Sequence, residues 1–156
     1  MSKKRPFWKT MSFDQMTPAQ WESLCDGCGR CCLYKFEDVD THEYFYTNVA
    51  CRFLDLETCR CTVYSERKEK MPSCVILSPT GISQLKWLPD TCAYRLIAEG
   101  KNLPKWHPLA SKDPQTVHLA GISIRNKAIP EQDIDMRDLE NYIVDQIKQY
   151  IRNSKR

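Results

Sequence analysis

The alternation of apolar and polar positions predicts short elements along most of the chain. The first is a helix from about residue 18 to residue 24, within "TPAQWESL". Thr17 is a suitable N-cap, Pro18 suits the first helical position, and Gln20 completes a capping box. The apolar side of this helix and of the segment before it would be formed by Phe13, Met16, Trp21 and Leu24.

The central part of the chain predicts small strands followed by a second helix. From residue 33 to residue 64 the pattern is aromatic and partly alternating, as in "LYKFED", "EYFYTNVACRFLD" and "CRCTVY", which is typical of short strands or irregular hairpins. The stretch "DTCAYRLIAEG" predicts a helix with Asp90 or Thr91 as its cap, Cys92 in its first turn and Gly100 at its end.

The C-terminal third predicts one strand and the longest helix. "VHLAGISIR" (117–125) is typical of a strand, and "DMRDLENYIVDQIKQYIRNSKR" (135–156) of an amphipathic helix. We expect the apolar stripe of this helix to pack on the body of the protein, with a partner-binding helix as the alternative. The stripe consists of Leu139, Ile143, Ile147 and Ile151, which recur every four residues.

Length and composition, taken with these predicted elements, indicate a fold class. The chain has 156 residues, of which 42% are hydrophobic, and this fits one domain with its own core. We predict a single α+β domain over residues 1–156, small, irregular and cysteine-rich, with short strands, flanking helices and a long C-terminal helix. Residues 18–92 would form a metal-binding core, and residues 101–156 a C-terminal cover with the amphipathic helix.

Charge and hydropathy argue against two classes of binding partner, nucleic acids and membranes. The net charge of +3 is small and its basic residues gather at the two ends, which counts against nucleic acid as a partner. No apolar run approaches the roughly 20 residues of a membrane helix, and the start has no apolar stretch of signal-peptide length. We therefore expect a cytoplasmic protein with no membrane association.

The nine cysteines carry the clearest chemical signal. Their number is odd, and a reducing cytosol keeps thiols free, so metal binding explains them better than disulfides do. Cys25, Cys28 and Cys31 stand in C-x-x-C-x-x-C spacing within "CDGCGRCC". Gly27 and Gly29 between them permit the positive φ angles that would turn successive thiolates toward one centre.

The spacing indicates a metal but leaves its identity open. An iron–sulfur run begins in the same way, but here Cys32 follows Cys31 at once and Leu33 takes the place of proline. The C-x-C pair Cys59 and Cys61 would complete a zinc site equally well. The number of metal centres, one or two, is also open. Neighbouring side chains in extended backbone point to opposite sides, so Cys32 would face away from Cys31 and toward a second centre.

The motifs "WESLCDGCGRCC", "TNVACRFLD", "TCRCTVY" and "LPDTCAYRLIAEGKNLPKWHPL" together resemble the YcgN family of bacterial proteins. This family is a branch of the group named for its C-x-x-C-x-x-C-C motif and for zinc or iron chelation. The resemblance implies zinc or an iron–sulfur cluster as the cofactor. The ligands it implies are Cys25, Cys28, Cys31, Cys32, Cys51, Cys59, Cys61 and Cys74, with Cys92 as a further ligand.

Two other classes of function compete with a metal-binding module. In a metal-dependent or cluster-dependent enzyme, acid–base chemistry would fall to His42, His107 or His118, although His107 between Trp106 and Pro108 is more typical of a packed, hydrogen-bonded histidine. No catalytic residue is assigned. In a zinc-stabilised nucleic-acid-binding domain, the affinity would depend on salt, and the small net charge argues against it.

Overall fold

The computed structural model describes residues 3–144, and the chain divides into two compact units. One unit contains Met1–Asp26 and Ile76–Thr116, and the other contains Gly27–Val75 and Val117–Arg156. We name them the aromatic unit and the cysteine unit after the side chains that distinguish them. Each is assembled from two separate stretches of chain, and the single domain over residues 1–156 stays a prediction.

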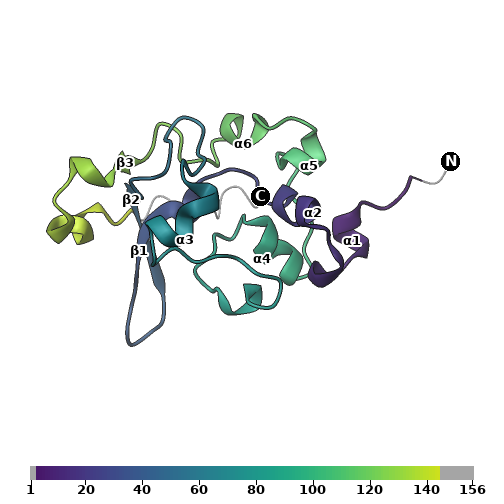
Figure 1. Ribbon diagram of the computed structural model, residues 1–156, viewed down its shortest axis with the longest axis horizontal. Helices are drawn as coiled ribbons and strands as arrows, with labels where there is room; N and C mark the ends of the chain where they lie inside the picture. The colour runs from purple at the N-terminus through teal and green to yellow at the C-terminus, as the bar shows by residue number, and fades with distance from the viewer. Residues whose placement is uncertain (1–2, 145–156) are drawn as a thin grey trace. The chain divides into compact units, whose positions relative to one another are not determined.

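The aromatic unit is built from short helices (Figure 1). Helix α2 (Pro18–Ser23) confirms the first predicted helix, because Thr17 Oγ1 accepts from Gln20 N at 3.1 Å while Gln20 Oε1 accepts from Thr17 N at 2.9 Å. The other helices of this unit are α1 (Phe7–Thr10), the 3-10 helices Phe13–Gln15 and Ile82–Gln84, α4 (Ala93–Ala98) and α5 (Pro108–Ser111).

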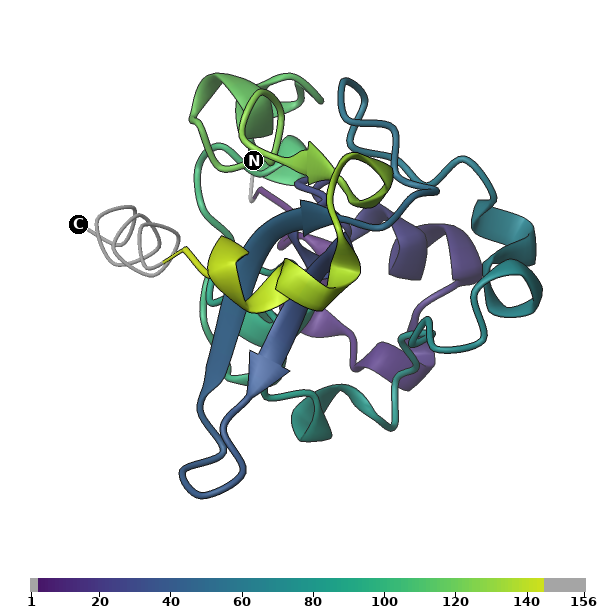
Figure 2. The same ribbon diagram turned by 90° about the vertical axis from the view of Figure 1, so that its left-hand side faces the viewer.

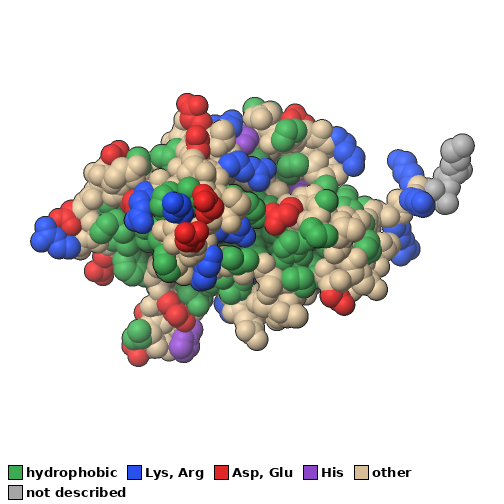
Figure 3. All heavy atoms as spheres, in the orientation of Figure 1, with side chains coloured by type: hydrophobic (Ala, Val, Ile, Leu, Met, Phe, Trp, Pro, Cys, Tyr) green, Lys and Arg blue, Asp and Glu red, His purple; other side chains and the backbone are tan. Residues whose placement is uncertain are grey.

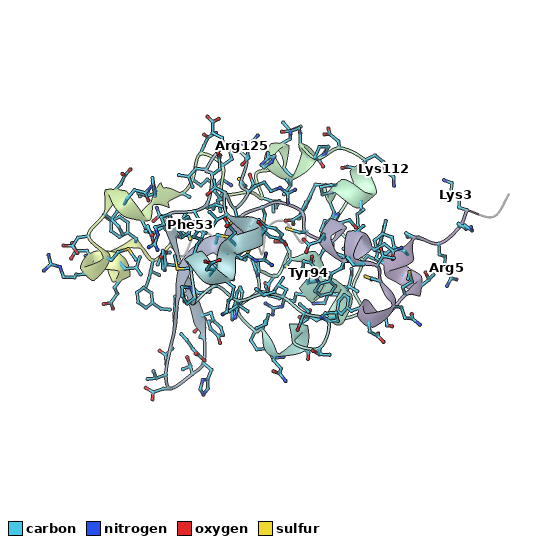
Figure 4. The ribbon with its side chains drawn as sticks, in the orientation of Figure 1. Lys3, Arg5, Phe53, Tyr94, Lys112 and Arg125 are labelled. Carbon is cyan, nitrogen blue, oxygen red and sulfur yellow. The ribbon has the colours of Figure 1, made fainter. Side chains whose placement is uncertain are left out.

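An aromatic core holds these helices together. The rings of Trp21 and Tyr94 lie 4.6 Å apart, and Phe13 meets the edge of Trp21 at 5.3 Å. Tyr94, labelled on α4 in Figure 4, also donates its hydroxyl hydrogen to the Trp21 carbonyl at 2.7 Å. Its buried hydroxyl is thus satisfied, as such groups must be to avoid a desolvation cost. The buried members of the core are Leu24, Ile82, Leu88, Ala93 and Tyr94.

The cysteine unit is organised by a three-stranded sheet in the order β1-β2-β3. Strand β1 (Leu33–Glu37) pairs antiparallel with β2 (Tyr44–Ala50), and β3 (Ile129–Pro130) runs parallel to β2 (Figure 2). The first two strands confirm the small strands predicted between residues 33 and 64. Their hairpin ends in a turn over residues 38–43, whose acidic and histidine side chains are visible at its tip in Figure 3.

A smaller apolar core lies beneath this sheet. It consists of Leu33, Ala50, Leu54, Cys59 and Ile124, with Cys32 packed against it. Gly29 is required here, since its φ is +77° and an added Cβ would stand 2.8 Å from Ile124 Cγ1. The loop that carries the cysteines therefore runs directly over the core. The unit also contains helix α3 (Arg67–Lys70) and the 3-10 helices Tyr64–Glu66 and Glu131–Asp133. Helix α6 (Thr116–Leu119) begins at the last residue of the aromatic unit and continues into this one.

Two predictions for the C-terminal third are wrong. Residues 117–125 form the end of α6 and turns instead of a strand. The long helix is not seen: residues 136–142 form a 3-10 helix beside β2, and Ile143 forms a bridge with Thr47 while Val144 N donates to Tyr46 O at 3.0 Å. Strand pairing satisfies that carbonyl and overrides the helical periodicity; the rest of the predicted helix, from residue 145, lies outside the described residues.

Candidate metal centre

The boundary between the two units falls inside the cysteine motif, between Asp26 and Gly27. Cys25 follows helix α2 and its C-cap in the aromatic unit, where its backbone N–H donates to Glu22 O at 3.2 Å and its side chain is exposed. Gly27 and Gly29 have φ angles of +78° and +77°, which confirms the positive φ predicted for both. The remaining motif cysteines lie in the cysteine unit with four others: Cys28, Cys31, Cys32, Cys51, Cys59, Cys61 and Cys74.

Five of these cysteines form one group of interacting side chains, which we name the thiol group. Its members are Cys31, Cys32, Cys51, Cys61 and Cys74. Cys32 is at its centre, because it is hydrogen-bonded to the Cys31 thiol and interacts electrostatically with Cys51 and Cys61. Cys74 interacts in the same way with Cys31 and Cys61. Segments about 10 to 40 residues apart in the chain thus contribute thiols that interact with one another.

Backbone pairing explains how these segments meet. Leu33 pairs with Ala50 across the sheet, and next to this pair Cys51 N donates to Cys32 O at 2.9 Å. A bridge between Leu54 and Cys61 then folds the chain back toward the same end of the sheet. The 3-10 geometry of residues 30–32 differs from the extended backbone on which we based opposite directions for Cys31 and Cys32, and their thiols hydrogen-bond to each other.

Ionisation of the thiol group is unfavourable when no cation is bound. The hydrogen bond with Cys31, burial, and the charges of the neighbouring thiols all raise the pKa of Cys32 well above its ordinary value. Burial also raises the pKa of Cys51 and of Cys74, and in both cases Cys61 adds to the effect. Each thiolate that forms makes the next one harder to form. A bound cation would offset this repulsion, and ionised thiolates are the species that bind metals.

Four basic side chains accompany the thiol group, and one of them, Arg52, opposes the rise in the pKa of Cys51. Lys35 on β1 donates to Cys31 O at 3.2 Å. Its pKa is lowered by burial, an effect that the thiols of Cys31, Cys32 and Cys74 oppose. Arg67 and Lys68, in α3, favour the charged form of Cys74 and oppose the rise in its pKa. Sequence reasoning missed all four, because only the fold brings them to the cysteines.

A carboxylate and a phenol lie beside the thiol group at Cys51. Glu131 is 8% exposed, receives the hydroxyl hydrogen of Tyr34 at Oε2, and has Arg52 Nη1 3.4 Å from Oε1. Burial and the Glu131 carboxylate raise the pKa of Tyr34, so the phenol stays protonated and donates. Glu131 raises the pKa of Cys51 as well. No local pattern marks this network, since 97 positions separate Tyr34 from Glu131.

Cys28 and Cys59 occupy a different place in the cysteine unit. Both are buried, at 8% and 4% exposure. Cys28 Sγ accepts from Arg30 N at 3.5 Å, and its carbonyl accepts from Ile124 N at 2.9 Å. Burial raises the pKa of Cys59, and a hydrogen bond from Ser123 opposes the rise. These contacts are those of packed thiols that join the motif to the core.

Cys92 belongs to the aromatic unit. It is the N-cap residue of α4, one position before the first turn where it was predicted, and its side chain makes no capping hydrogen bond. The thiol packs against the aromatic core. Its role as a ligand, like that of the other eight cysteines, stays a prediction. The predicted stop at Gly100 is confirmed, since this residue has a φ of +71° just after the helix.

The three histidines take separate roles. His107 is fully buried and uses both ring nitrogens, because Nε2 donates to Leu24 O at 2.8 Å and Nδ1 accepts from Leu109 N at 3.0 Å. This confirms the prediction of a packed, hydrogen-bonded histidine. His118 Nδ1 lies 2.8 Å from Ser123 Oγ, the same serine that contacts Cys59. His42 lies at the exposed hairpin turn, 3.2 Å from Glu37 Oε1.

The donor chemistry of the thiol group fits zinc or iron, which accept soft sulfur ligands. All nine cysteines are free thiols. Within residues 3–144, however, no three or more His, Cys, Asp or Glu side chains are grouped closely enough to hold one ion as they stand. The thiols therefore fit such a metal by type and neighbourhood, and they would have to close further to share one ion.

The fold and the thiol group define a class of small α+β proteins rich in free cysteine. The chain belongs to the UPF0260 family. It is 55% identical to a UPF0260 protein of Sinorhizobium fredii over 139 residues, 89% of this chain and 90% of the relative. It is 53% identical to one of Granulibacter bethesdensis over 144 residues, 92% of this chain and 86% of the relative.

A second comparison concerns chemistry. Residues 24–93 match the CxxCxxCC family, described as "Putative zinc- or iron-chelating domain". This match supports metal binding and the broader of the two resemblances, while the YcgN branch stays a prediction. No solved structure matches the chain. None of the helices among the described residues is long and apolar enough to cross a membrane.

Proposed function

We propose that this protein binds zinc or an iron–sulfur cluster through the thiol group of the cysteine unit. The observation that carries the proposal is the position of Cys32, whose side chain interacts with the thiols of Cys31, Cys51 and Cys61. Four sulfur donors from three segments of chain match the number that structural zinc sites and cubane clusters use. The description of the CxxCxxCC family supports the same chemistry.

The protein side of binding follows from the residues. The thiols must lose protons to become ligands, and their mutual repulsion makes this step depend on the arriving positive charge. Cys28 and Cys59 would anchor the loop through Ile124 and Ser123 rather than act as first ligands. Nine free thiols also suit a reducing compartment, so the cytoplasm is the location we propose.

Anaerobic purification followed by metal and sulfide analysis tests this proposal. A brown protein with iron and labile sulfide identifies a cluster, and a colourless protein with zinc identifies a zinc site. Cys32→Ser should lose most of the metal, whereas Cys92→Ser, a matched substitution in the aromatic unit, should keep it. Wild-type protein without stoichiometric metal, or Cys32→Ser with a full complement, would refute the proposal.

A further inference from the structure

Lys35 is placed at the thiol group by an irregularity in the sheet. The register of β1 against β2 shifts between Leu33 and Lys35, so more residues of β2 than of β1 lie in this stretch. Thr47 Oγ1 donates to Tyr34 O at 2.7 Å and accepts from Val49 N at 3.2 Å, which stabilises the bulge. Such bulges redirect side chains relative to a regular ladder.

The surroundings of the Lys35 ammonium are those of a cation held near sulfur. Nζ is 3.2 Å from Cys31 O and 5.3 Å from the centroid of the Tyr46 ring. The side chains that favour its charged form are the thiols of Cys31, Cys32 and Cys74, which are members of the thiol group. Burying a lysine costs free energy unless negative charge is near, and neutral thiols provide little of it.

Ionised thiols provide that charge. A divalent ion surrounded by four thiolates carries two net negative charges, and a partly buried site with that charge is unfavourable without cations nearby. Lys35 interacts electrostatically with three of the five thiols, whereas Arg67 and Lys68 act on Cys74 and Arg52 acts on Cys51. The positive ammonium and the negative metal-loaded thiol group would therefore each lower the free-energy cost of burying the other charge.

We propose that Lys35 is the counter-ion of the metal-loaded thiol group, a positioning residue whose positive charge allows the cysteines to bind as an all-thiolate set. The proposal rests on the proposed function and adds to it a residue that is not a ligand. Groups in this position around metal sites typically contribute 10- to 100-fold to affinity. We expect a loss of that size when the charge of Lys35 is removed, and recovery when it is restored.

The test measures Co²⁺ and Zn²⁺ binding to the full-length protein, anaerobically, against a chromophoric chelator. Thiolate-to-cobalt charge-transfer absorption reports how many thiolates bind. Lys35→Met should bind both ions roughly 10- to 100-fold more weakly, Lys35→Arg should regain most of the loss, and Lys105→Met, an exposed lysine of the aromatic unit, should match the wild type. Far-UV circular dichroism of the metal-loaded proteins checks that the fold is kept.

Wild-type affinity in Lys35→Met would overturn the counter-ion role, and so would Lys35→Arg binding as weakly as Lys35→Met, since packing rather than charge would then matter. A wild type that binds cobalt without thiolate charge transfer would overturn the proposed function itself.

Discussion

The aromatic unit and the cysteine unit are stabilised by different means. The first buries Leu24, Leu88 and Tyr94 among several aromatic rings and satisfies its buried histidine with two hydrogen bonds. The second has a small core of five residues, one of which is a cysteine, beneath a loop of thiols that repel one another when ionised. Apolar packing therefore distinguishes the aromatic unit, and we expect the stability of the cysteine unit to depend on what its cysteines bind.

Metal removal should produce the largest difference between the units. Structural thiolate sites contribute on the order of 10 kcal/mol to folding when zinc is bound. After anaerobic chelation, we expect hydrogen exchange to accelerate in residues 27–75 and 117–144 and to change little in residues 76–116. Amide exchange read by mass spectrometry measures this for each segment. Equal acceleration in both units, or none in either, would show that the two do not differ in this way.

Truncation of a side chain in the aromatic core should have the opposite effect to metal removal: it should destabilise the aromatic unit and leave metal binding unchanged. Leu88 is 2% exposed in the aromatic core, so Leu88→Ala should lower the free energy of unfolding by about 2–5 kcal/mol. Metal content should stay at the wild-type level, because the thiol group lies in the other unit. Denaturant unfolding and metal analysis measure both. Leu119→Ala, at an 81% exposed position, is the control and should change stability by less than about 0.5 kcal/mol.

Alkaline pH should destabilise the cysteine unit of the metal-free protein. The folded-state pKa of Cys32 lies above its unfolded value of 9.0. The contribution of the neutral thiol to the free energy of unfolding is therefore fully present below pH 9.0 and declines as the pH rises beyond it. The unfolded chain then releases a proton that the folded chain retains, at about 1.4 kcal/mol per pH unit for one thiol.

Urea titrations of reduced, metal-free protein at increasing pH measure this loss. Cys32→Ala should flatten the alkaline decline, although the raised pKa values of Cys51 and Cys74 preserve part of it. Cys92→Ala in the aromatic unit is the control. An identical decline in wild type and Cys32→Ala would assign the effect to other groups.

Local signals in the sequence predicted local structure well. The Thr17 and Gln20 capping box forms as expected, and Gly27 and Gly29 have the positive φ that the motif requires. These features depend on a few neighbouring residues, so a pattern of a few positions contains the information. The helix predicted from residue 135 was wrong over the described residues because pairing with the distant Thr47 decided the backbone at Ile143. The strand predicted at residues 117–125 was wrong because this segment turns on itself, with Ile122 N and Ser123 N both donating to Val117 O.

The candidate metal site likewise has features that the sequence predicted and features that only the fold shows. Cysteine spacing pointed to the chemistry, but it could not separate the thiol group from the packed Cys28 and Cys59, which depends on where Ser123 and Ile124 lie. Lys35 was read only as part of a strand, because its proximity to three thiols arises from a bulge. Residue types are visible in a sequence, whereas the charges around them require the fold.

The smallest effect that we predict tests whether a local loss in the aromatic unit leaves metal binding intact. Thr17→Ala removes the side-chain acceptor for Gln20 N at the start of α2 and should cost about 1 kcal/mol. Thr17→Ser keeps the acceptor and should restore most of that stability, which separates capping from the loss of a methyl group. Since α2 leads to Cys25 and no member of the thiol group lies in its unit, metal per chain should be unchanged in both variants. A fall in metal content that follows the loss of stability, measured on the same samples, would instead make Cys25 and its helix part of the binding site.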